Sequence, residues 1–130
     1  MKIELLILLL TVGLGFIQLL IASAAATKVR GKNYNFSSRD EQQPSLKGKP
    51  ARLDRAFKNF QETFPFFLAG VFIVMANDKA GMISAISAIV YLLARMIYVF
   101  LYVYDVIYVR TAVWMISVLG ILGLYAQNFL

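Results

Sequence analysis

Four polar side chains at the front of an apolar segment are the residues of this sequence best suited to chemistry. They are Arg52, Arg55, Asn59 and Glu62, and they lead into the apolar run 64–76. At 100° per residue they fall within about 80° of one another, so a helix would carry them along one stripe. Charge that enters a membrane helix is costly and marks a functional site by default. The stripe therefore predicts a polar site at a membrane surface.

A second polar row lies in the apolar segment 81–103. Its members fall within about 60° of each other on a helix: Tyr91, Arg95, Tyr98 and Tyr102. Glu62 lies about two and a half turns inside its own helix, where an unpaired carboxylate would cost several kcal/mol. Arg95 is about two turns from its helix end, so we expect it to pair with Glu62. The alternative is a polar network that only joins the helices.

Two further arginines and one proline belong to the same set of candidates. Arg110 opens the last apolar segment, and Arg30 shares a helical face with Thr27 at the end of the first. A basic residue at either place could simply anchor a helix to lipid headgroups. Pro65 removes a backbone hydrogen bond just beyond Glu62, which suits a polar cavity but is also common in membrane helices.

The composition indicates an integral membrane protein. Of 130 residues 60% are hydrophobic, and the mean hydropathy is +0.70, well above the apolar share of a soluble domain. Cysteine and histidine are absent, which excludes disulfides, Ser-His and Cys-His catalytic pairs and the usual zinc sites, so we expect no metal. The formal charge of +6 does not indicate nucleic acid, because most of it lies in one loop.

Four membrane-spanning helices account for nearly the whole chain, so we predict a single all-α membrane domain over residues 1–130. The expected helices are 3–26, 52–76, 81–103 and 109–129, with a polar loop at 27–51. A cleaved signal peptide is the alternative for the first segment, because Ala22–Ala26 resembles a cleavage site.

The distribution of lysine and arginine predicts the orientation. The first loop and the start of the second helix hold nine basic residues, whereas the turn at 77–79 holds one. The first loop is therefore expected to be cytoplasmic, in a bacterial inner membrane, with both termini on the opposite side. The stripe and Arg110 would then meet at the same membrane face.

The sequence Arg55-Ala56-Phe57-Lys58-Asn59-Phe60-Gln61-Glu62-Thr63-Phe64-Pro65 resembles the Arg-Ala-x-x-Asn-x-x-Glu-x-x-Pro signature of the membrane-associated proteins in eicosanoid and glutathione metabolism, the MAPEG family. Arg95, Tyr98 and Tyr102 resemble the family's third-helix pattern, and Arg110 resembles the arginine that begins its fourth helix. The length and the four-span layout also agree, and a bacterial-type microsomal glutathione transferase is the nearest description.

This resemblance implies a homotrimer that binds glutathione, as a cosubstrate, between adjacent subunits near the cytoplasmic face. Arg110 would face the sulfur as the catalytic residue, and Arg30 would come from the neighbouring subunit. The remaining residues implied to bind or border glutathione are Arg52, Arg55, Asn59, Glu62, Arg95, Tyr98 and Tyr102. Thr63, Phe57 and Tyr98 depart from some relatives, which weakens any transfer of eicosanoid specificity.

The residue types suit that ligand. Glutathione has two carboxylates and an ammonium group, which arginine forks and a carboxylate would bind. A guanidinium in a partly dry site lowers the pKa of a thiol and stabilises its nucleophilic form. We therefore expect a transferase that conjugates glutathione to lipophilic electrophiles in detoxification or lipid metabolism, with a possible peroxidase activity on lipid hydroperoxides. The alternatives are a non-catalytic membrane scaffold of the same fold, which binds a lipid or a partner, and a purely structural membrane protein.

Overall fold

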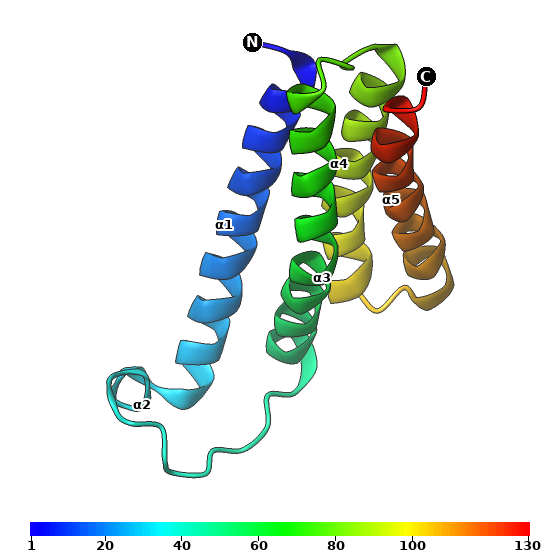
Figure 1. The fold of residues 1–130 in the computed structure, drawn as a ribbon. Helices are drawn as coiled ribbons and strands as arrows, with labels where there is room; N and C mark the ends of the chain where they lie inside the picture. Colours follow the sequence, from blue (N-terminus) through cyan, green and yellow to red (C-terminus); the bar gives the residue numbers. More distant parts are fainter.

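The computed structural model describes all residues from Met1 to Leu130, and every regular element in it is a helix. Four long helices lie side by side, and a short fifth helix interrupts the first connection (Figure 1). The helices are α1 (Ile3–Arg30), α2 (Lys32–Phe36), α3 (Gly48–Ala76), α4 (Met82–Val103) and α5 (Ile107–Gln127). The prediction of an all-α bundle with four long helices is confirmed.

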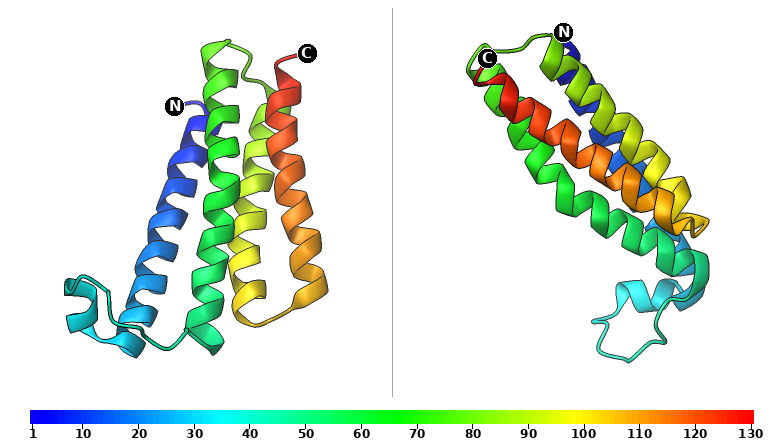
Figure 2. Two further views of the ribbon diagram at one scale, coloured as in Figure 1. Left: turned by 60° about the horizontal axis from the view of Figure 1, so that its bottom comes forward. Right: turned by 90° about the vertical axis from the view of Figure 1, so that its right-hand side faces the viewer.

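Both chain termini lie at one end of the bundle, together with the turn between α3 and α4 (Figure 1). The other end carries residues 31–47 and the turn between α4 and α5, and we call it the loop end (Figure 2). The start of α3, the end of α4 and the start of α5 therefore meet at the loop end, as the sequence predicted for the stripe and Arg110.

Three helices have boundaries that differ by more than one residue from those predicted from the sequence. α1 continues four residues beyond Ala26, through the small-residue stretch of the alternative cleavage site, and ends before Gly31, whose φ is 91°. α3 begins at Gly48 rather than Arg52, because Pro50 lies in the first turn, where proline is tolerated. α5 begins at Ile107 and ends at Gln127. Polar helical turns thus extend beyond the apolar segments at the loop end.

The surface of the bundle is apolar, and its interior contains polar groups. All four long helices are long and apolar enough to cross a membrane. Large exposed side chains such as Phe16, Phe72 and Leu119 cover the outside, whereas Thr11 and Ser84 are fully buried. This distribution fits a bundle solvated by lipid, where small and polar residues pack between helices.

Close packing joins α4 to α5 and to α3. A side-chain carbon on Gly120 of α5 would lie 2.9 Å from the backbone oxygen of Ser87 on α4, so this crossing requires glycine. On the other side, the Phe67 and Tyr91 rings stack with centroids 4.2 Å apart, and the Thr63 and Tyr91 hydroxyls are hydrogen-bonded at 2.8 Å. These contacts fix the position of the α4 polar row against α3 and α5.

Candidate functional site

The stripe on α3 is tied to the end of α4 by two arginine hydrogen bonds. Arg52 donates from Nε to the carbonyl oxygen of Val103 at 2.8 Å, and Arg55 donates from Nε to the hydroxyl of Tyr102 at 3.2 Å. Val103 is the last residue of α4, so its carbonyl has no partner within the helix. At the loop end, the Arg52 guanidinium of the stripe therefore provides the hydrogen-bond donor that the last carbonyl of α4 lacks.

Tyr102 lies at the centre of a cluster of positive charge. The guanidinium carbon of Arg110 is 4.5 Å from the centroid of its ring, and that of Arg55 is 5.9 Å away. The ion pairs in the structure are Lys2–Asp78 and Lys58–Asp54, so no carboxylate neutralises either arginine. Two guanidinium groups held at one aromatic ring without an acidic partner form a site suited to an anion.

Arg95 extends this cluster into the bundle. It is 0% exposed, its guanidinium carbon lies 4.3 Å from the Tyr98 ring centroid, and its three nitrogens have no hydrogen-bond partner. The Tyr98 and Tyr102 rings are 5.6 Å apart, so the row on α4 is continuous from Arg95 to the loop end. A buried guanidinium without partners is costly, and it can be satisfied by a further anionic group.

The expected ion pair between Glu62 and Arg95 is absent from the structure. Glu62 is exposed and makes no salt bridge. The reason is the rotation of α3 about its own axis. The buried seam of this helix includes Ala56 and Phe60. That seam is centred about 90° from the stripe, so the stripe flanks the contact with α4.

Two predicted binding residues therefore remain unpartnered beside the cluster, and a third lies elsewhere. Asn59 has a buried side-chain oxygen without a hydrogen bond, and Glu62 has a free carboxylate. Arg30 stacks on Tyr34 of α2, 5.9 Å from the ring centroid, and borders a hollow of about 270 Å³ with Thr27. The structure does not bring Arg30 to the cluster around Tyr102.

Two features of the site were not identified from the sequence. The carbonyl of Val103 is a backbone group whose role depends on where α4 ends, and no residue type signals it. The Thr63 hydroxyl could have been found, because it lies one residue beyond Glu62 and can reach Tyr91 of the polar row. No three acidic, histidine or cysteine side chains gather in a way that could hold a metal ion.

Comparison with protein families matches residues 6–130 to the MAPEG family, which is nearly the whole chain. No curated protein and no solved structure matches the sequence. The matched region includes α3, α4 and α5 in full and therefore every residue of the cluster around Tyr102.

Proposed function

Because the chain belongs to the MAPEG family and is thus an integral membrane protein of glutathione and eicosanoid metabolism, we propose that it is a glutathione transferase. It conjugates the glutathione thiolate to lipophilic electrophiles and also reduces lipid hydroperoxides. The observation that carries this proposal is the cluster of Arg55 and Arg110 around Tyr102, which has no acidic partner. An anionic cosubstrate supplies the missing negative charge.

The unpartnered groups match the charges of glutathione. Arg52 and Arg55 each use Nε for an internal hydrogen bond, which leaves the terminal guanidinium nitrogens to bind carboxylates. The free carboxylate of Glu62 binds the ammonium group, and the Asn59 amide binds the peptide. Tyr98 and Tyr102 supply hydroxyls and hold the arginines by their rings.

Arg110 is the catalytic residue in this proposal. Its guanidinium faces the Tyr102 ring and has no carboxylate partner, so its charge is available to a sulfur anion. It stabilises the thiolate after the thiol has released its proton to water, and the sulfur then forms a bond to the electrophilic carbon as the leaving group departs. Lipophilic electrophiles reach the site from the bilayer, where they are concentrated.

A homotrimer would complete this site. Arg30 is held near α2, away from the cluster of its own subunit, and the Nε of its guanidinium is buried without a hydrogen bond. In the trimer, Arg30 of one subunit would reach the glutathione bound by its neighbour. The loop end is cytoplasmic in this proposal, since it holds most of the basic residues of the chain and since glutathione is a cytoplasmic thiol.

A glutathione titration of the purified protein tests the proposal. We expect saturable binding, together with the ultraviolet absorbance of a thiolate, followed by turnover of an aryl halide or of a fatty acid hydroperoxide. A protein that binds no glutathione and gives no thiolate signal would be the non-catalytic scaffold of the same fold. Saturable binding without turnover would retain the site assignment and reject the enzymatic activity.

A further inference from the structure

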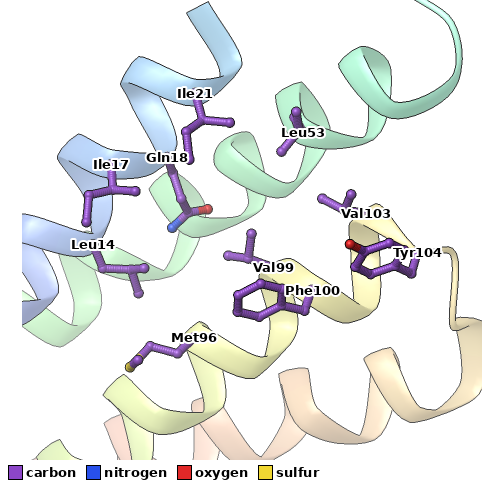
Figure 3. Close-up of a pocket in the computed structure, with 10 residues that line it drawn as sticks. All are labelled: Leu14, Ile17, Gln18, Ile21, Leu53, Met96, Val99, Phe100, Val103 and Tyr104. Atoms are coloured by element: carbon purple, nitrogen blue, oxygen red, sulfur yellow. The ribbon is translucent and has the colours of Figure 1, made fainter. Parts of the chain in front are cut away.

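A second cavity lies on the side of α4 that faces α1 and is lined almost entirely by apolar residues (Figure 3). Its volume is about 300 Å³, and nine of its ten lining residues are hydrophobic. α1 contributes residues between Leu14 and Ile21, α4 contributes residues between Met96 and Val103, α3 contributes Leu53, and Tyr104 follows directly after α4. This volume is at the lower end of the range for ligand pockets, roughly 300–1,000 Å³.

Gln18 is the exception in this lining. The residue is 6% exposed, and both polar atoms of its amide are buried without any hydrogen-bond partner. Figure 3 shows the amide directed from α1 into the cavity, toward Val99 and Phe100 of α4. An amide left unpaired between membrane helices is costly, and an occupant with hydrogen-bonding groups would satisfy it.

The unpaired amide specifies the chemistry of that occupant. Its nitrogen needs an acceptor and its oxygen needs a donor, and a hydroxyl group offers both. A carbonyl or an ether would satisfy only the nitrogen, and a plain hydrocarbon would satisfy neither. A charged group is disfavoured by the apolar walls.

The shape of the cavity and its surroundings specify the rest of the ligand. The wall of the cavity that runs from Met96 to Tyr104 is about 12 Å long at 1.5 Å per residue. This length suits a single extended acyl chain. Tyr104 lies at the loop end of this wall, and the exposed Lys49 amine lies 5.3 Å from its ring centroid. A ligand carboxylate at the loop end would therefore lie near the positively charged amine of Lys49.

We propose that this cavity binds a hydroxylated acyl chain, with the chain hydroxyl bonded to the Gln18 amide and the carboxylate near Lys49. The site is separate from the arginine cluster, and its assignment does not depend on glutathione binding. The two sites adjoin at Val103, whose side chain lines the cavity and whose carbonyl binds Arg52.

The test compares two fatty acids on the full-length protein in lipid nanodiscs. Binding of octadecanoate and of a mid-chain hydroxyoctadecanoate is measured by competition with a radiolabelled chain. The wild type should prefer the hydroxylated acid by about tenfold, as expected for pairing a buried amide. Gln18→Met, which keeps the size of the side chain, should lose this preference. The control Gln61→Met, at an exposed position of α3 outside the cavity, should retain it.

A methoxyoctadecanoate probe tests the same assignment without a mutation. Its oxygen accepts but cannot donate, so it should bind the wild type more weakly than the hydroxy acid. Equal affinity of the wild type for octadecanoate and the hydroxy acid would overturn the proposal. So would a Gln18→Met variant that keeps the preference, or one that changes only the oligomeric state, since Gln18 would then face a second copy of the chain.

Discussion

Replacement of Arg110 by leucine should shift the pH dependence of conjugation to higher pH. In the proposed site the guanidinium stabilises the thiolate, so it would lower the pKa of the bound thiol, and its removal would raise that pKa. The rate follows the fraction of thiolate and rises as the pH passes the pKa. The variant should therefore be slow at neutral pH and should recover in alkaline solution. Glutathione affinity should change little, because other residues bind the carboxylates.

The structure supports an estimate of the size of this effect. Arg110 is partly buried and is unpaired with any carboxylate. A charge about 4 Å from the sulfur would contribute roughly 4 kcal/mol at an effective dielectric constant of about 20. Solvent and salt screening reduce this by about one third to two thirds, to about 1.4–2.7 kcal/mol. The expected rise is thus about one to two pKa units, and the loss of turnover at neutral pH is about tenfold to hundredfold.

The assay measures initial rates with an aryl halide at saturating glutathione, from neutral to alkaline pH. The rates of the variant and the wild type should converge at high pH, because a thiolate of higher pKa is the stronger nucleophile once formed. Lys79→Leu removes the same charge at the far end of the bundle, from an exposed residue, and serves as the control. A profile of unchanged shape, whether the rate falls or not, would refute the assignment of Arg110 to the thiolate.

Three other substitutions test the site and the packing that supports it. Glu62→Gln should weaken glutathione binding about tenfold to hundredfold in calorimetry without changing the unfolding temperature of the free protein, because the carboxylate has no partner in the fold. Thr63→Val leaves the buried Tyr91 hydroxyl unpaired and should reduce thermal stability by about 1–2 kcal/mol. Gly120→Ala should cost about 1–3 kcal/mol, whereas Gly13→Ala, which has open space around it, should cost little. A Glu62→Gln protein that loses stability but keeps its affinity would instead support a purely structural role for this carboxylate.

The sequence predicted which residues share a helix face, but not how the faces meet. Periodicity placed Arg52, Arg55 and Glu62 on one stripe, and the structure brings the two arginines to the end of α4. The rotation of α3 is set by packing of Phe60 and Phe67, which periodicity within one helix does not reveal. The prediction of an ion pair between Glu62 and Arg95 was therefore wrong.

The prediction of helix ends from the sequence was limited by a similar ambiguity. Pro50 and Gly48 were interpreted as loop residues, although both also occur at the beginning of a helix. The first turn of α3 extends Lys49 toward Tyr104, a contact that the shorter helix would not have made. The apolar segments themselves are a strong signal, so the number and order of the long helices could be predicted from the sequence alone.

The tight crossing of α4 and α5 at Gly120 has a consequence for assembly. These two helices form a hairpin that carries Tyr98, Tyr102 and Arg110, whereas Arg52 and Arg55 belong to α3. A ligand that bridges the hairpin and α3 binds only when the two have docked, so its binding free energy adds to that of docking. At a concentration one hundred times its dissociation constant, such a ligand contributes about 2.7 kcal/mol. If glutathione is that ligand, as proposed, its binding would stabilise the docked arrangement of the hairpin and α3.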